Sequence, residues 1–214
     1  MSTNSYIYSE WRKECIIIDP GGDYQKIISH MAIKNLKPRG IVCTHGHLDH
    51  ISAAGAIQRH FKDEELHIPV AVHEKDKGYL GPRAAKAHEK SFNGLSIDAD
   101  EIFSIFGDDF PNPDVILEEG DTVFESTLQV IHTPGHTQGS ICLYSESLGI
   151  LFSGDTLFFE GVGRTDLHKG DSKALLKSIR EKLFILPEET RIFPGHGPNT
   201  TLEREIKNNP YVSV

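Results

Sequence analysis

The sequence has no long hydrophobic run and carries fewer basic than acidic residues. None of its uninterrupted apolar stretches approaches the ~20 residues that a membrane-spanning helix needs, so we expect no membrane partner. The N-terminus lacks a basic segment followed by an apolar core, and we expect no secretion signal. Lys and Arg number 22 against 31 Asp and Glu, and the formal net charge is −9. Nucleic-acid binding is therefore not expected, because phosphate contacts need a basic face.

Cysteines are also scarce, with Cys15, Cys43 and Cys142 forming no CxxC pair. Each lies in an apolar, β-branched setting, which predicts a small buried hydrophobic side chain rather than a nucleophile or a metal ligand. Free thiols of this kind are typical of a reducing compartment, so we expect a cytoplasmic location.

Short apolar runs and amphipathic stretches interleave along the 214 residues. Periodicity predicts helices at 23–36, 49–61 and 171–184, with two shorter ones near 74–90 and 200–208. Runs rich in Ile, Val, Phe and Leu predict strands at 15–19, 40–45, 68–73, 128–133, 140–145, 149–155 and 191–196. This order indicates an α/β layered fold, which we expect to form one domain over residues 1–214. The segment 91–121, rich in Gly, Pro and acidic residues, is predicted to be a loop over an active site.

The stretch "THGHLDH" places three histidines and an aspartate within six residues, directly after an apolar run. His45 and His47 are two residues apart, so they point the same way if the chain is still extended. Asp49 and His50 follow where the next helix is expected to begin, and their side chains approach from another direction. Imidazole and carboxylate are ligands of divalent first-row metals, so the stretch predicts a metal site.

Three more residues of the same chemistry follow predicted strands in glycine-containing turns. They are His136 in "TPGHTQGS", Asp155 in "LFSGDTLF" and His196 in "IFPGHGP". Loops after strands gather at one edge of a sheet, so these side chains are expected near the first four. One metal needs roughly three or four protein ligands, and seven residues therefore suit two metals with one shared carboxylate.

The other histidines are expected to lie outside the metal site. We interpret six of them as solvated: His30, His60, His67, His73, His88 and His168. His132 is an intermediate case that could orient a ligand from outside the coordination shell.

These motifs, in this order and at these separations, resemble the metallo-β-lactamase superfamily from about residue 17 to the C-terminus. The resemblance implies a four-layer αββα sandwich with a dinuclear site at one edge. It further implies that His45, His47 and His136 hold the first metal. Asp49, His50 and His196 would hold the second, and Asp155 would bridge the two. Asp19, which ends the first predicted strand, matches the family position that supports a ligand from outside the coordination shell.

Two metals ~3.5–4 Å apart can share a hydroxide and lower its pKa towards neutrality, which supplies a nucleophile without Ser or Cys. Asp49 is the residue placed to orient this water and accept its proton. The expected reaction is hydrolysis of a small-molecule thioester or ester. The ligand set suits two divalent ions, with Zn the first expectation and Fe or Mn as alternatives.

The segment "GDTLFFEGVGRTD" is similar to glyoxalase II, the hydroxyacylglutathione hydrolases, which cleave thioesters such as S-lactoylglutathione. In that family a basic residue nine positions after the bridging aspartate contacts the glutathione, and here it is Arg164. A surface salt bridge is the alternative interpretation of Arg164. A persulfide dioxygenase, with one iron held by two His and one Asp, has a similar "GRTD" stretch and is the alternative enzyme. A non-catalytic metal-binding module is the alternative of a different class.

The chain also departs from glyoxalase II. Only a short segment follows "PGHGP", where the family continues into a helical domain that contacts glutathione. Asp166 and Pro198 stand where the family tends to have aromatic residues. We therefore expect glutathione to be bound weakly, because a carboxylate beside an anionic substrate disfavours binding unless Arg164 pairs with it.

Overall fold

Two five-stranded sheets form the centre of the computed structural model, which describes residues 3–10, 12–63, 65–92, 101, 103–104, 107 and 109–212. Across the first sheet the order is β1 (Tyr6–Tyr8), β2 (Glu14–Ile18), β3 (Lys37–Val42), β4 (Val70–His73) and β5 (Val115–Leu117). Neighbours from β2 to β5 run parallel, whereas β1 runs antiparallel to β2.

The second sheet is mostly antiparallel. Its order is β12 (Thr200–Thr201), β11 (Arg191–Pro194), β8 (Ile150–Gly154), β7 (Ile141–Ser145) and β6 (Gln129–His132). Only β8 and β11 pair in parallel within this sheet as described. A small hairpin of β9 (Leu157–Phe158) and β10 (Gly161–Val162) follows β8.

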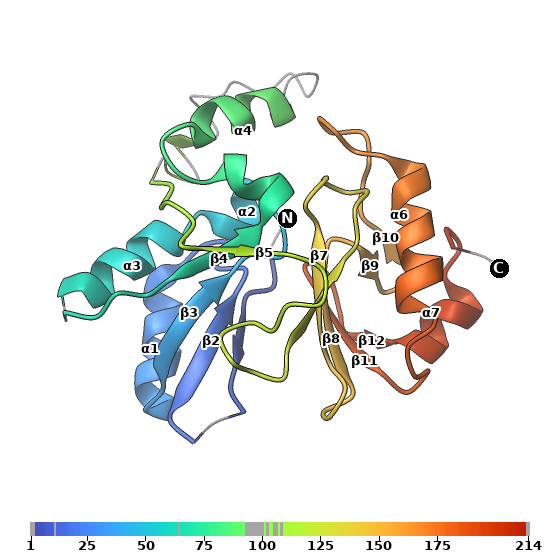
Figure 1. Cartoon of the computed structure of the whole chain (residues 1–214), viewed down its shortest axis with the longest axis horizontal. Helices are drawn as coiled ribbons and strands as arrows, with labels where there is room; N and C mark the ends of the chain where they lie inside the picture. Colours follow the sequence, from blue (N-terminus) through green and yellow to red (C-terminus); the bar gives the residue numbers. More distant parts are fainter. Residues whose placement is uncertain are drawn as a thin grey trace.

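Helices cover the outer faces of both sheets (Figure 1). Those of the first half are α1 (Tyr24–Lys34), α2 (Leu48–Ile51), α3 (Ala54–Asp63), the 3₁₀ helix η1 (Glu74–Tyr79) and α4 (Ala84–Phe92). Those of the second half are α6 (Ser172–Ser178), the π-helical turn η2 (Ile179–Leu183) and α7 (Leu202–Asn208). No helix in the described ranges is long and apolar enough to cross a membrane.

The strands are apolar on both faces because both faces of each sheet are covered. In β2, Cys15 and Ile17 pack outward in the cluster that contains residues of α1 and α3, while Ile16 and Ile18 pack between the sheets. In β7 the same alternation puts Leu143 between the sheets and Cys142 against α6 and η2. Side chains alternate across a strand, so one continuous apolar run serves two cores. The result is the predicted αββα sandwich, and the three cysteines are free and buried as expected.

Several predicted elements differ from the observed ones, and the short helix expected near 74–90 is observed as η1 and α4. The helix expected at 49–61 is divided into α2 and α3, because the Ala53 amide donates to the Pro20 carbonyl at 2.9 Å and the Ser52 hydroxyl donates to the Gly21 carbonyl at 2.6 Å. Segment 91–121 is not simply a loop, since β5 lies within it and extends the first sheet. Residues 93–100, 102, 105–106 and 108 of this segment lie outside the described residues.

Candidate metal centre

The loop after β3 carries four of the seven predicted ligands. His47 is the residue before α2 and still has extended backbone angles, with φ −71° and ψ 147°, so α2 starts directly after it. Gly46 lies against Tyr79, and a Cβ at this position would come within 2.3 Å of the Tyr79 ring. Glycine is therefore required for the close approach that fixes the loop.

Ring nitrogens of the first three histidines converge on one point. His136 Nε2 is 2.8 Å from His47 Nδ1 and 3.2 Å from His45 Nε2, and all three side chains are buried. The His136 Nδ1–H donates to the Arg164 carbonyl at 2.8 Å. In a neutral ring this bond leaves the lone pair of Nε2 directed at the other two histidines.

A second group of ligands comes from two separate segments, the start of α2 and the loop after β11. His196 Nε2 is 3.4 Å from His50 Nε2 and 3.3 Å from Asp49 Oδ2. Gly195 makes this approach possible, because a Cβ there would lie 2.3 Å from Asp155 Oδ1 and 2.7 Å from the His50 ring. The glycine of the "PGHGP" turn is thus required by the side chains that it faces.

Asp155 lies between the two groups. Its Oδ1 is 3.3 Å from His50 Nε2, and its Oδ2 is 3.6 Å from His136 Nε2 and 3.4 Å from His196 Nε2. One carboxylate therefore faces histidines of both groups, which is the position a bridging ligand requires.

Asp19 fixes one of these histidines. Its Oδ2 accepts from His50 Nδ1 at 2.9 Å, and the same carboxylate accepts from the Thr44 amide at 2.7 Å and the Thr44 hydroxyl at 2.6 Å. Asp19 is buried and has a left-handed backbone with φ 49°. A carboxylate on one ring nitrogen sets the tautomer and directs the other nitrogen to the metal side.

The charges of the centre are strongly coupled. Burial, followed by the charges of neighbouring histidines, holds the pKa values of His45 and His47 well below the ordinary value. Burial alone would lower the pKa of His50 too, but Asp155 and Asp19 raise it well above 6.5. Hydrogen bonds with Asp155 and Asp49 raise the pKa of His196 to about 10. Neutral His45 and His47 are in the form that binds metals.

The seven side chains fit a metal group. Three sets of mutually close ligand atoms occur among them: His45, His47 and His136; His45, His50 and Asp155; and Asp49, His50 and His196. Buried nitrogens this close cannot all carry protons, and Asp155 Oδ1 is buried without a hydrogen-bond partner among the described residues. A cation between these atoms would bind the unprotonated nitrogens and would also be a partner for Asp155 Oδ1.

Arg164 is placed differently from the other predicted site residues. Its guanidinium donates from Nε and Nη2 to the two carboxylate oxygens of Asp166, both at 2.7 Å, and the pair is exposed. The hydrogen bond from Arg164 lowers the pKa of Asp166 to about 2. The surface salt bridge considered for Arg164 is therefore present, while its carbonyl supports His136.

Asp76 is a supporting residue that sequence reasoning missed. Its Oδ2 accepts from the Gly46 amide at 3.0 Å and the Thr137 hydroxyl at 2.7 Å, and its Oδ1 accepts from the Gly139 amide at 2.8 Å. This buried carboxylate therefore joins the loop of His45 and His47 to the loop of His136. Nothing in "HEKD" distinguishes it from a surface carboxylate.

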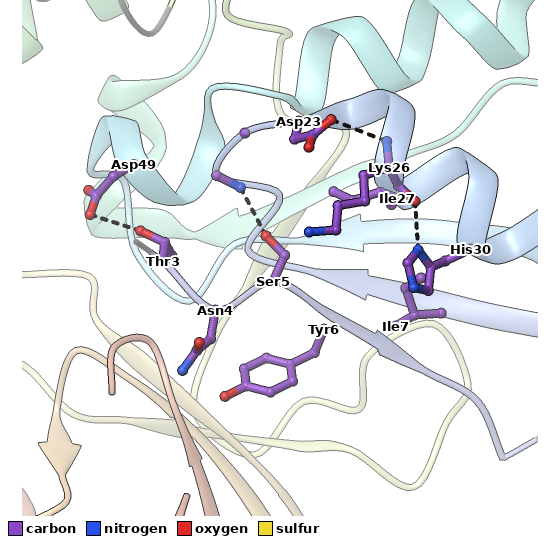
Figure 2. Close-up of a pocket in the computed structure, with 12 residues that line it drawn as sticks. Thr3, Asn4, Ser5, Tyr6, Ile7, Asp23, Lys26, Ile27, His30 and Asp49 are labelled. Carbon is purple, nitrogen blue, oxygen red and sulfur yellow. Dashed lines mark hydrogen bonds between the residues drawn. The ribbon is translucent and has the colours of Figure 1, made fainter. Parts of the chain in front are cut away.

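The N-terminal segment was missed as well. The Thr3 hydroxyl donates to Asp49 Oδ2 at 3.0 Å, and Asn4 Nδ2 donates to the carbonyls of Pro194 and Gly197 at 3.0 and 2.8 Å. Figure 2 shows Thr3 turned toward Asp49 at one end of a cavity of about 700 Å³. This segment therefore touches both loops of the second group.

Two histidines predicted to be solvated are buried instead. His73 stacks on His132, with ring centroids 4.0 Å apart, and His88 packs against Phe110 and Tyr79. Among the described residues, the His132 ring forms its hydrogen bond with the Gln138 carbonyl, at 2.9 Å, and not with a ligand. The prediction failed because an imidazole with a single polar partner packs as an aromatic ring.

The chain is similar to known proteins over nearly its whole length. The sequence profile of the metallo-beta-lactamase superfamily matches residues 1–196. The probable metallo-hydrolase YqgX of Bacillus subtilis is 36% identical over 203 residues, which cover 94% of this chain and 88% of that protein. Hydroxyacylglutathione hydrolase GloC of Haemophilus influenzae is 35% identical over 204 residues, with the same two coverages of 94% and 88%.

Solved structures agree in fold. BLEG-1 B3 metallo-beta-lactamase has a TM-score of 0.81 and 37% identity, covering 99% of this chain and 95% of that one. TTHA1623 in a di-iron-bound form has a TM-score of 0.75 and 34% identity, covering 98% and 94%. ETHE1 from Myxococcus xanthus has a TM-score of 0.72 and 28% identity, covering 98% and 79%.

Proposed function

The chain belongs to the metallo-beta-lactamase superfamily, and from this premise we propose that it hydrolyses thioesters of the hydroxyacylglutathione type with a dinuclear metal centre. The observation that carries the proposal is Asp155, whose two oxygens face histidines of both ligand groups. The likeness to GloC supports the substrate class. We also propose that residues 1–214 act as one domain, because both sheets contribute ligands.

In the proposed assignment, His45, His47 and His136 hold one ion, and Asp49, His50 and His196 hold the other, with Asp155 between them. Five imidazoles and two carboxylates without a thiolate favour Zn and also accept Fe or Mn. Divalent ions bound there would lower the pKa of water and polarise a substrate carbonyl.

The residues around the ions have separate roles in this proposal. Asp49 accepts the proton of the attacking water on its carboxylate, which the Thr3 hydroxyl orients. Asp19 keeps the proton of His50 on Nδ1, and the Arg164 carbonyl keeps that of His136 on Nδ1. Each of these contacts leaves the Nε2 lone pair facing the centre.

In this proposal Arg164 contributes only weakly to substrate binding. Its bidentate pair with Asp166 must loosen before the guanidinium can reach a substrate carboxylate. An exposed charge pair contributes little, so we expect a high KM for S-lactoylglutathione. The free, buried cysteines support the proposal of a reducing, cytoplasmic environment.

The test is metal analysis of protein purified from unsupplemented cells, followed by a hydrolysis panel on the same sample. We expect close to two ions per chain and cleavage of S-lactoylglutathione and simpler thioesters. A β-lactam belongs in the panel because BLEG-1 is described as a B3 metallo-beta-lactamase. Efficient β-lactam cleavage without thioester cleavage would overturn the substrate class.

Persulfide dioxygenation is the second candidate, favoured by the "GRTD" stretch at 163–166. It needs only two histidines and Asp155 on a single iron, whereas Asp49, His50 and His196 also converge here. Oxygen uptake with glutathione persulfide that follows iron content, without thioester cleavage, would reverse the order of the two candidates.

A further inference from the structure

A strongly basic cavity is lined by Tyr79, whose ring packs against that of His47. It has a volume of about 250 Å³ and is lined by η1, α4 and the loop before α6. Its cationic side chains are Lys75, Arg83, Lys86, Lys90 and Lys169. Figure 1 shows α4 and the loop before α6 on opposite sides of the upper end of the molecule. We call this space the basic cavity.

The charge of the basic cavity is unusual for this chain. The whole sequence has a formal net charge of −9, yet no carboxylate is among the described residues that line the cavity. Two nearby acids have other partners, since Glu74 pairs with Lys77 at 2.5 Å and Asp166 pairs with Arg164. In the described part of the chain, none of the five cations forms an ion pair. The mutual repulsion of these cations is unfavourable, and a bound anion would reduce it.

One wall of the basic cavity contacts the metal centre, and the other belongs to a loop that supports the centre. Tyr79, in one wall, has its ring centroid 5.9 Å from that of His47 and packs against Gly46. Lys169, in the other wall, follows Arg164 in the loop whose carbonyl holds His136. The Tyr79 side chain therefore belongs both to the wall of the basic cavity and to the surroundings of the first ligand group.

We propose that the basic cavity binds the anionic end of the thiol part of the substrate; this inference rests on the proposed thioesterase function. A hydroxyacyl group of the lactoyl type is short and uncharged, so the negative charge of such a substrate resides on the thiol. A space of about 250 Å³ suits one charged end rather than a whole ligand, since complete ligand pockets usually measure roughly 300–1,000 Å³. The charged end carries either carboxylates, as in glutathione, or phosphates, as in coenzyme A.

The test uses the double variant Lys86→Gln/Lys90→Gln in the metal-loaded full chain. Both side chains are exposed and one helical turn apart on α4, so the fold should tolerate the change. Lys34→Gln/Lys37→Gln removes the same charge at the C-terminal end of α1 and the start of β3, the end of that strand away from the centre, and serves as the control.

Three thioesters with the same acyl group separate the outcomes: one of glutathione, one of coenzyme A and one of neutral N-acetylcysteamine. We expect the α4 variant to raise KM for an anionic thioester on the order of tenfold, with kcat and the neutral thioester unchanged. A larger rise in KM for the glutathione thioester identifies carboxylates as the bound group. A larger rise for the coenzyme A thioester identifies phosphates. An equal loss with the neutral thioester, or no change with either anionic one, would overturn the proposal.

A binding measurement keeps this inference separate from the proposed function. Calorimetry with the free thiols, glutathione and coenzyme A, on chelator-treated protein reports the basic cavity without any hydrolysis. We expect at least one to bind the wild-type chain and the Lys34→Gln/Lys37→Gln variant, and to bind the α4 variant about tenfold more weakly. If no thioester is cleaved but this difference holds, the proposed function fails and the anion site stands. If all three proteins bind both thiols equally, the anion site is refuted.

Discussion

At the scale of single residues, a substitution of Asp155 distinguishes one shared dinuclear centre from two independent metal sites. Asp155→Ala removes a carboxylate whose two oxygens lie 3.3 to 3.6 Å from histidine nitrogens of both groups, so both ions should bind more weakly. We expect the metal content measured by mass spectrometry to fall well below that of the wild type at both positions. Glu146→Gln, an exposed change in the turn between β7 and β8, should leave it unchanged. Full dinuclear loading of Asp155→Ala would contradict the bridging role.

His88 predicts a dependence of stability on pH. Burial lowers the pKa of His88 from 6.5 to about 4, while its Nε2–H donates to the Tyr79 carbonyl at 3.0 Å. Between these two values the unfolded chain binds a proton that the folded chain refuses, so stability is lost as the pH falls through this window. From pH 7.5 to 5.0 the loss attributable to His88 should be about 2 kcal/mol.

The measurement is the free energy of unfolding in urea at both pH values, with chelator present throughout. His88→Gln keeps a donor to the Tyr79 carbonyl and cannot titrate. Its loss between pH 7.5 and 5.0 should be smaller than that of the wild type by this amount. Equal losses in the two proteins would show that His88 is protonated in the folded state.

At the scale of elements, Asp76 couples two loops that are distant in sequence. Asp76→Asn replaces an acceptor by an NH₂ group that faces a backbone N–H or the Thr137 hydroxyl, so at least one of the three hydrogen bonds is lost. We expect a destabilisation of about 1–3 kcal/mol, because a buried donor is left without a partner. Calorimetric titration with Zn should also show weaker binding at the first ligand group, His45, His47 and His136. Asp63→Asn, at the exposed C-terminal end of α3, is the matched control and should behave as the wild type.

The N-terminal segment should affect the other ligand group. Asn4→Ala removes two hydrogen bonds to the loop that carries His196, and residues that support ligands in this way typically change metal affinity ten- to a hundredfold. We expect a weaker second ion, a preserved first ion and a nearly unchanged melting temperature in the presence of chelator. Weakening of both ions by the same factor would assign Asn4 a general structural role instead.

The sequence predicts the positions of seven strands because their apolar runs are short and bounded by turn residues. It does not predict β5, whose three residues follow an acidic and Pro-containing stretch, or the division of the helix at 49–61. It also misses β1, β9, β10 and β12, which are only two or three residues long. That division depends on hydrogen bonds to Pro20 and Gly21, which are brought there by the fold. Helical periodicity in the sequence carries no information about a contact with a distant loop.

The same distinction holds for the centre. The four ligands between His45 and His50 lie in one stretch and can be recognised from residue type and spacing. Asp76 and Asn4 act through partners 30 to 193 positions away in the sequence, with ordinary residue types in ordinary surroundings. The burial that makes them supporting residues exists only in the folded chain.

At the scale of the whole molecule, the seven side chains come from both sheets. Four follow β3, while His136, Asp155 and His196 follow β6, β8 and β11. Ions at the centre would bind the folded chain far better than the unfolded one, and stability would rise with free metal concentration. At a free concentration 100 times the dissociation constant the gain is about 2.7 kcal/mol for one site. A melting temperature that chelation leaves unchanged would refute this coupling.

Joining the two sheets through their ligands has a consequence for the life of the protein in a cell. Chains that have not acquired ions open more often, and proteases degrade the open form. Copies without metal would therefore be removed faster than loaded copies. The supply of the ion would set the abundance of the protein as well as its activity, and a shortage would reduce the number of inactive molecules that compete for the substrate.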